Sequence, residues 1–351
     1  MTHSMTRRGM LAGAAACGVL PMLSGCAAVG LGASTTPGTG GQATALLLPL
    51  TGAAAGVGQN MARAASLVTQ GDEASAPKVY DTGDTADGAA TAAKAAIAAG
   101  AKILMGPLKA DQTPAVLAVA GRVPVITFSN DDGLADQGAF VMGITPAQSV
   151  STMFSYARAQ GITKVAVVAR PGALGEATAT AARQIGAAGG IEITAVLLTE
   201  PGGNLALNGA QAVFLPDGGK ALAGFARSLN GVQLLGSVQW GITDIEADGN
   251  LAGAWFAAPP PDLFLPFADR FEAAFGEAPG VVAGLGHDAA LLAVGLGNGK
   301  GVSRKGITRA AGFTGVLGGF RFLSSGRCQR DLSVLTLNAG NLSVLAEVTG
   351  T

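Results

Sequence analysis

Short apolar runs alternate with longer helix-like stretches along this chain, and this alternation constrains the fold more than any other feature. Between residues 43 and 143 the apolar runs have the length of strands, and the stretches between them have the length of helices. Such alternation predicts a parallel sheet that helices cover on both faces. The expected strands are 45–50, 78–80, 102–105, 123–128 and 140–143, and the expected helices are 59–70, 87–99 and 111–120.

The same pattern starts again near residue 144 and predicts a second α/β block of similar size. A body of 43–351 is long for one hydrophobic core, so two similar lobes are expected. Three consecutive prolines at 259–261 then form a stiff break. The expected helices of the second half are 149–160, 175–188, 219–229, 263–275 and 281–295, and the expected strands are 164–169, 191–198, 212–215, 232–236, 319–323, 332–337 and 342–348, the last three as antiparallel hairpins.

The first 42 residues have the pattern of an export signal followed by a tether. Arg7 and Arg8 precede an apolar stretch at 10–22, which has the length of a signal-peptide core and is too short to span a membrane. The stretch ends in Leu-Ser-Gly-Cys, which resembles a bacterial lipobox, so we expect a signal at 1–26 that ends at a lipidated Cys26. A plain signal peptide with a chance cysteine is the alternative, and the export route is either general secretion or twin-arginine transport.

Residues 27–42 are mostly Gly, Ala, Ser, Thr and Pro and carry no charge, which is typical of a flexible linker. The formal net charge of −1 gives no basic footprint for nucleic acid. Without residues 1–26 the chain keeps one cysteine, Cys328, so no intramolecular disulfide is expected. No apolar run of the body reaches the roughly 20 residues of a membrane span.

Catalysis finds little support in the residue pattern. The body has one histidine, His287, and lacks the G-x-S-x-G and P-loop motifs, so no metal, cofactor or catalytic residue is expected. The stretch 284–289 fits a loose dinucleotide fingerprint but follows a Pro-Gly break rather than a strand. His287 beside Asp288 is either a general base or a half-buried histidine at the start of a helix, and the second interpretation is favoured.

Polar and glycine-rich loops follow several expected strands, where ligands bind in open α/β sheets. Residues 48–60 connect a strand to a helix, where free N–H groups and the helix dipole favour a bound anion; a plain tight turn is the alternative. The loops at 105–111 and 127–130 have the same placement, and Lys109 is a candidate counter-ion or a solvated lysine.

Several stretches in order resemble type I periplasmic binding proteins, which include the leucine/isoleucine/valine-binding family. They include ALLLPLTGAAAGVGQNMARAASL, AAIAAGAKILMGPLKADQTPAV, VPVITFSN, ITKVAVVARPGALGEA and FEAAFGEAPGVVAGLGHDAALLA. The resemblance covers 43–351 and implies an α/β fold of two doubly wound parallel-sheet lobes, joined by three hinge crossings, with a ligand in the cleft. It places lobe one at 43–143 and 255–320 and lobe two at 144–254 and 321–351.

The same resemblance implies a set of cleft residues, with Ser129 on the loop that holds the ligand in amino-acid-binding members. Leu174 stands where such members often have tyrosine, and the loop after 232–236 offers Trp240 rather than an acidic residue. An ammonium group without a carboxylate partner is poorly compensated, which argues against standard amino-acid binding. The candidate ligand-binding residues are Thr51, Gly106, Leu108, Ser129, Asn130, Leu174 and Trp240.

A second branch of these lipoproteins, the penicillin-binding-protein activators, matches the departures better. The stretches 235–240, 253–255 and 312–330 resemble that branch. The leading hypothesis is therefore a non-enzymatic lipoprotein, anchored through Cys26 on the periplasmic side of a bacterial membrane, that regulates a peptidoglycan synthase by contact. The alternative is a lipoprotein that delivers a branched-chain amino acid or similar small polar ligand to an ABC permease, and a hydrolase using His287 and Asp288 is the third hypothesis.

Overall fold

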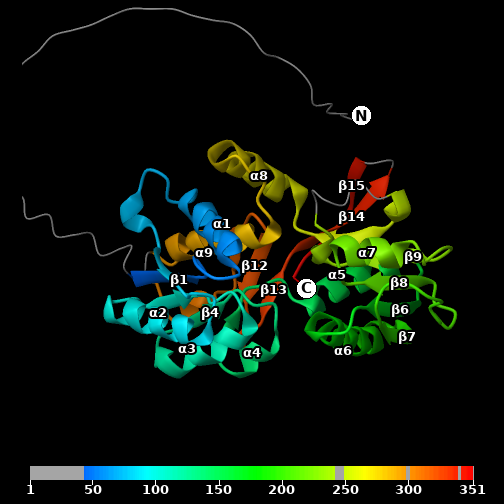
Figure 1. The fold of residues 1–351 in the computed structure, drawn as a ribbon, viewed down its shortest axis with the longest axis horizontal. Helices are drawn as coiled ribbons and strands as arrows, with labels where there is room; N and C mark the ends of the chain where they lie inside the picture. Colours follow the sequence, from blue (N-terminus) through cyan, green and yellow to red (C-terminus); the bar gives the residue numbers. More distant parts are fainter. Residues whose placement is uncertain (1–42, 242–248, 298–300, 339–340, 351) are drawn as a thin grey trace, which may run out of the picture. The chain divides into compact units, whose positions relative to one another are not determined.

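The computed structural model describes residues 43–241, 249–297, 301–338 and 341–350, all within one compact unit, Gly38–Thr351. The expectations for the signal, Cys26 and the linker at 27–42 lie outside the described residues. Within the described ranges, no helix has the length and apolar character that a membrane crossing requires. The described residues contain both large sheets and their cores (Figure 1).

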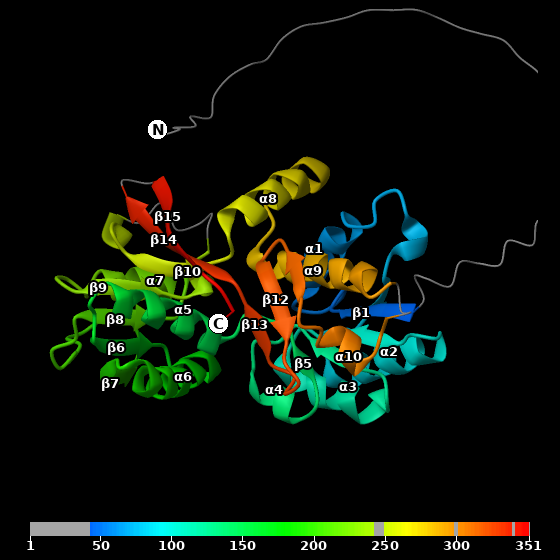
Figure 2. The ribbon, with the colours of Figure 1, turned by 180° about the vertical axis from the view of Figure 1, so that it is seen from behind.

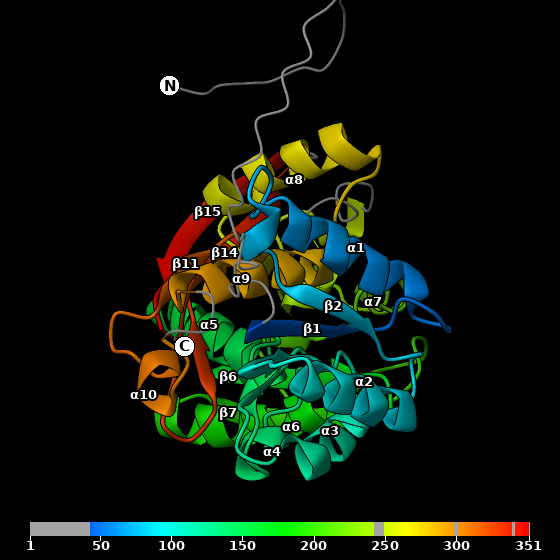
Figure 3. The same ribbon diagram turned by 90° about the vertical axis from the view of Figure 1, so that its left-hand side faces the viewer.

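The first lobe is built on a five-stranded parallel sheet in the order β2-β1-β3-β4-β5. Alternate residues of β1 face opposite sides, so Leu46 packs with Met61 of α1 while Leu47 packs with Ala93 of α2. Figure 3 shows α1 and α9 on one side of β1 and α2 and α3 on the other. The elements are β1 Thr44–Leu48, α1 Ala55–Ser66, β2 Lys78–Asp81, α2 Ala86–Ala98, β3 Ile103–Met105, α3 Thr113–Ala120, β4 Val125–Thr127, α4 Gly133–Asp136, β5 Phe140–Val141, α8 Pro261–Phe275, α9 Val281–Gly295 and α10 Arg304–Ile307.

The second lobe is built on a seven-stranded sheet in the order β15-β14-β10-β9-β8-β6-β7. The strands from β10 to β7 pair in parallel, and the hairpin of β14 and β15 adds two antiparallel strands at one edge. The parallel strands are buried apolar runs, as expected for a sheet covered on both faces. The elements are α5 Pro146–Ala159, β6 Lys164–Ala169, α6 Ala173–Gly189, β7 Glu192–Leu198, β8 Ala212–Leu215, α7 Gly219–Ala226, β9 Gln233–Gly236, β10 Trp255–Ala258, β14 Leu332–Asn338 and β15 Asn341–Val348.

A three-stranded antiparallel sheet of β11 Phe313–Gly315, β12 Gly318–Phe322 and β13 Cys328–Arg330 precedes the final hairpin (Figure 2). The strand pairings differ from the expected lobe boundaries at two places. β10 pairs with β9, so the chain leaves the second sheet after Ala258, where the prolines cannot donate ladder hydrogen bonds, rather than at 255. Because β13 pairs with β12, the last crossing comes after Arg330 rather than at 321.

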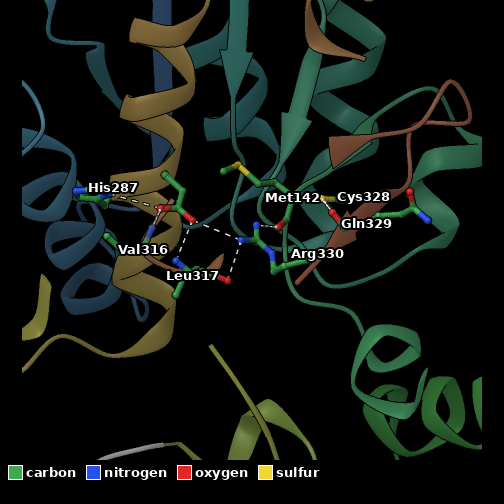
Figure 4. A network of polar contacts seen from close by, with 8 residues as sticks. Met142, His287, Val316, Leu317, Cys328, Gln329 and Arg330 are labelled. Carbon is green, nitrogen blue, oxygen red and sulfur yellow. Dashed lines mark hydrogen bonds and ion pairs between the residues drawn. The ribbon is translucent and has the colours of Figure 1, made fainter. Parts of the chain in front are cut away.

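A buried polar cluster ties two of the crossings to α9 (Figure 4). The Asp288 carboxylate on α9 accepts the N–H groups of Val316 at 2.7 Å and Leu317 at 3.3 Å, and it lies 3.4 Å from Nη1 of Arg330. Nη2 of Arg330 donates to the carbonyl of Met142 in the first crossing at 3.3 Å. Both charged side chains have no exposed surface, so this pair is fully desolvated.

Candidate functional site

The donors after β1, where the sequence predicts an anion site, are occupied by the protein's own carboxylate, Asp81. Its Oδ1 accepts the N–H groups of Leu50 at 2.9 Å, Thr51 at 3.2 Å and Gly83 at 2.8 Å, and its Oδ2 accepts the Thr51 hydroxyl at 2.7 Å. Desolvation raises the pKa of Asp81, but the hydrogen bonds from Gly83, Thr51 and Leu50 outweigh it, so the pKa is lowered. Thr51 is therefore committed to an internal partner.

A second carboxylate, Asp84, lies at the start of α1. It accepts the N–H of Ala54 at 3.1 Å, the Lys109 ammonium at 2.8 Å and the Gln112 amide at 3.3 Å. The hydrogen bond from Lys109 lowers the pKa of Asp84 most, and it outweighs the desolvation of a side chain that is 6% exposed. Lys109 is thus the counter-ion of Asp84, which leaves the start of α1 already neutralised.

Gly106 and Leu108 serve packing in this structure. A Cβ at Gly106 would lie 2.2 Å from the Leu47 carbonyl oxygen, and φ is +123°, so only glycine fits this close approach of two strands. Leu108 is half-buried and packs against the main core. Neither residue lines the cavity described below.

The loop after β4 is held by its own hydroxyl groups. Ser129 is 3% exposed, its N–H donates to Oγ1 of Thr127 at 3.2 Å, and its Oγ accepts the N–H of Asp131 at 3.1 Å. These bonds fix the turn and point the following residue outward. Asn130 is exposed and lines a small cavity together with residues of the second lobe.

In this cavity Asn130 and Leu174, predicted site residues from the two lobes, meet. It has a volume of about 10 Å³, close to the roughly 10–15 Å³ that one water needs. The hydroxyl of Thr178 on α6 is buried without a hydrogen-bond partner, and the Ser149 hydroxyl on α5 lies 3.5 Å from the N–H of Val238. The lining residues are Asn130, Ile144, Thr145, Pro146, Ser149, Leu174, Thr178, Phe214, Pro216, Ser237, Val238 and Gln239.

Leu174 at the first turn of α6 lines the cavity as the sequence suggests, but Trp240 does not. The Trp240 indole is 3% exposed, donates from Nε1 to the Leu215 carbonyl at 2.9 Å and stacks on Phe256 with ring centroids 5.6 Å apart. Its ring also fills the space that a side chain at Gly236 would need. Trp240 is therefore a core residue of the second lobe.

Three residues that shape these strand ends are not among the candidates predicted from the sequence: Ser149, Thr178 and Asp217. Oδ2 of Asp217, which follows β8, accepts the N–H of Arg170 at 3.0 Å and so satisfies the loop after β6. Asp217 comes just after a predicted strand, as Ser129 does. The same sequence signal that predicts Ser129 at the carboxyl edge of a sheet therefore also predicts Asp217 there. Ser149 and Thr178 lie on helices facing the cavity, and no local pattern marks them.

His287 lies in the middle of α9, not at the start of a helix as expected. Its side chain is 6% exposed, packs edge-on against Phe267, and has its Nδ1 3.5 Å from Asp288. The glycines of 284–289 are part of the same helix, so no phosphate-binding loop exists there. Within the described ranges, no group of three or more His, Cys, Asp or Glu residues could hold a metal ion.

Solved structures with the same fold are numerous, although no curated protein matches the chain. A branched-chain amino acid ABC transporter protein from Rhodospirillum rubrum aligns with TM-score 0.76 at 21% identity, covering 86% of this chain and 99% of that one. A leucine-binding protein from Thermotoga maritima aligns with TM-score 0.64 at 18% identity, covering 87% and 98%. A solute-binding protein of an ABC transporter from R. palustris, in complex with benzoate, aligns with TM-score 0.64 at 19% identity, covering 88% and 96%.

These alignments confirm the expected type I fold. The family model described as periplasmic binding protein matches residues 44–341, which is most of the chain and every described strand except β15, of which it includes only Asn341. The chain therefore belongs to the periplasmic binding protein family.

Proposed function

We propose that the protein binds a small polar solute between its two lobes and delivers it to an ABC transporter. The observation that carries this proposal is the small cavity between the lobes, in which the polar side chain of Asn130 of the first lobe meets Ser149 and Thr178 of the second. A buried hydroxyl without a partner costs about 1–3 kcal/mol, and a ligand that supplies the missing hydrogen bond removes that cost. The similar structures include proteins of branched-chain amino acid transport and a benzoate complex, which supports a small organic solute.

The cavity must open before it can take such a solute. Ligand sites of drug-sized molecules have volumes of roughly 300–1,000 Å³, far above the about 10 Å³ found here. The lobes are joined by crossings near 142–146, 259–261 and 331, so a hinge motion about these segments would separate the walls of the cavity. The lining of the cavity then gives the groups that the solute meets on closure: hydroxyls, the amides of Asn130 and Gln239, and apolar side chains that include the half-buried Leu174.

The strand ends also limit the class of solute. Asp81, Asp84 and Asp217 already fill backbone donors that would otherwise hold an external carboxylate. An anionic group at either strand end would compete with a fixed carboxylate and meet like charge. We therefore infer a solute recognised through neutral polar groups, such as hydroxyl or amide, with any charged group directed to solvent.

The test is calorimetric titration of residues 38–351 with the common amino acids, their amides and benzoate. Thr178→Val keeps the side-chain shape and removes the hydroxyl, so we expect the affinity for the solute that binds to fall about tenfold, the equivalent of one hydrogen bond. Thr180→Val is the matched control, since Thr180 is exposed on the same helix. Equal affinities in the two variants, or no binding of any solute in a wider screen, would contradict the proposal.

A second candidate is activation of a peptidoglycan synthase by contact, the leading hypothesis from the sequence. Two observations support it: the cavity is closed to a small volume, and backbone N–H groups after β1 and β6 already donate to Asp81 and Asp217. Both suit a protein that acts through its surface and not through a bound solute. Stimulation of a purified synthase by this protein, in the absence of any solute, is the measurement that favours it. Absence of both stimulation and synthase capture removes this candidate.

The anchor is a separate proposal. Lipid on Cys26 would hold the body on the periplasmic side of a membrane, in agreement with the family. Labelling of the expressed protein with a radioactive fatty acid should be lost in Cys26→Ser and retained in Cys17→Ser. Label that persists in Cys26→Ser shows that the anchor is elsewhere.

A further inference from the structure

A basic hollow lies at the amino ends of the first-lobe strands, the edge opposite to the candidate site. Lys102 precedes β3, Arg122 precedes β4, and Gly138 precedes β5. Because these strands are parallel, their amino ends meet at one edge of the sheet. The wall from the C-terminal half of the chain is Val302–Arg304, so four separate segments converge on the hollow.

The hollow has the volume of a ligand site, about 720 Å³. Three of its lining residues are cationic, and none of its described lining residues is acidic. The lining residues are Lys102, Leu117, Ala120, Gly121, Arg122, Val123, Pro124, Val125, Gln137, Gly138, Phe140, Val302, Ser303 and Arg304.

The three cationic side chains of the hollow form no ion pair with a carboxylate of the described residues. Arg304 lies 5.1 Å from the centroid of the Phe140 ring and donates to the Ser324 carbonyl, which fixes its guanidinium while leaving donors free. Lys102 and Arg122 have exposed side chains, and neither side chain forms a hydrogen bond or ion pair with any described residue. Lys109, by contrast, is paired with the carboxylate of Asp84.

We propose that this hollow binds a phosphate group. Guanidinium groups offer planar donor pairs to phosphate oxygens, and an ammonium adds a point charge. A phosphate bears several oxygens over which three cations can be distributed, which matches three converging side chains without a competing acid. The ligand is either a soluble phosphorylated compound or the headgroup of an anionic phospholipid.

The point at which the chain enters the body supports a phospholipid headgroup as the source of the phosphate group. The N–H of Lys102 donates to the Ala43 carbonyl at 2.7 Å, so the chain enters the body beside the hollow. The proposed anchor, Cys26, precedes this point by a short linker, so the membrane surface would lie within reach of this edge in an anchored body. The binding of phosphate itself does not depend on the anchor or on the solute site.

The test compares residues 38–351 with Lys102→Gln/Arg122→Gln, using Arg183→Gln/Lys220→Gln as a control with the same loss of charge on exposed positions of the second lobe. Each protein is titrated with glycerol 3-phosphate and cosedimented with vesicles of phosphatidylglycerol or of phosphatidylcholine. The hollow variant should lose roughly 25-fold in vesicle affinity, a factor of about five for each basic side chain near an anionic surface.

Binding to phosphatidylglycerol alone identifies the headgroup as the source, and binding of glycerol 3-phosphate as well identifies the phosphate group as sufficient. Either result supports the proposal when the hollow variant loses binding and the control retains it. Equal losses in the two variants, or no binding to any probe at 50 mM salt, would overturn it. Unchanged affinity of the hollow variant for the solute of the inter-lobe cavity separates this test from that of the proposed function.

Discussion

Removal of the charge on Asp288 tests the hinge cluster most directly. Asp288→Asn keeps the shape of the side chain but replaces one carboxylate oxygen by an NH₂ group. The two carboxylate oxygens serve Val316, Leu317 and Arg330, all of them donors (Figure 4). The amide offers one acceptor and places its own donors against a donor, so at least one of these groups loses its acceptor.

The size of the effect follows from burial. Asp288 and Arg330 have no exposed side-chain surface, so water cannot replace the lost partner. Breaking a buried pair by removing one charge costs about 3–5 kcal/mol, since the remaining charge is left uncompensated. Asp269→Asn on the exposed face of α8 is the control and should change stability by less than about 0.5 kcal/mol.

Urea unfolding of residues 38–351 measures the loss. Both tryptophans, Trp240 and Trp255, belong to the second lobe, so their fluorescence reports that lobe while circular dichroism reports the whole molecule. Coincident transitions justify a single free energy of unfolding. Adding Arg330→Met to Asp288→Asn should recover part of the loss because it removes the orphaned charge. A loss below about 1 kcal/mol in Asp288→Asn would refute the reasoning, since a buried unsatisfied donor alone costs that much.

Three further predictions concern packing, pH and thiol reactivity. A Cβ at Gly286 would lie 2.2 Å from the Met61 carbonyl oxygen, so Gly286→Ala should lower stability by more than about 2 kcal/mol, whereas Gly56→Ala meets no atom within 4 Å and should be neutral or slightly stabilising; similar urea midpoints would contradict this. Because the pKa of Asp84 is lowered in the folded state, its contribution is present above the unfolded value of 3.8 and is lost as pH falls through the folded pKa. The stability gap between the protein and Asp84→Asn should therefore shrink on acidification from pH 5 to pH 2, and a gap independent of pH argues against the assigned role. Burial raises the pKa of Cys328 to about 11, so its thiol should react with Ellman's reagent only on unfolding, and rapid labelling of the native protein would show that the site opens.

The apolar pattern predicted the succession of strands and helices because both sheets are buried on two faces. Strands β6 and β8 and helix α9 have the predicted limits, since each apolar run is bounded by residues that stop the element. Helix α1 begins at Ala55 rather than 59 because Gly56 and Gly58, expected in a loop, are helical. Gly58 allows the helix to approach the Pro49 carbonyl oxygen, which a Cβ would meet at 2.1 Å.

Site residues were predicted less well because their roles depend on partners distant in sequence. Thr51 follows β1 at the carboxyl edge of the first sheet, as predicted. Its hydroxyl, however, donates to Asp81, which is thirty positions away in the sequence. Trp240 lies in a loop whose sequence pattern predicts a polar surface. Its ring instead packs in the core, where it stacks on Phe256 and fills the space left by the missing side chain of Gly236. Asn130 and Leu174 do line the cavity, since a turn and a helix start directly after a strand leave their side chains outside the sheet.

The carboxyl edge of the first sheet carries carboxylates, whereas the amino edge carries cationic side chains. We therefore expect the two edges to bind different classes of ligand. At the carboxyl edge, the N–H groups of Leu50, Thr51 and Ala54 are bound by Asp81 and Asp84, and the Lys109 ammonium is paired with Asp84, so an incoming anion would compete with both carboxylates. At the amino edge, the described residues that line the hollow with Lys102 and Arg122 include no acid. A phosphate-bearing molecule should therefore occupy the basic hollow and leave the inter-lobe cavity to a neutral polar solute. If the phosphate compound instead competed with the solute for one site, the carboxylates at the strand ends could not hold the positions that the structure gives them.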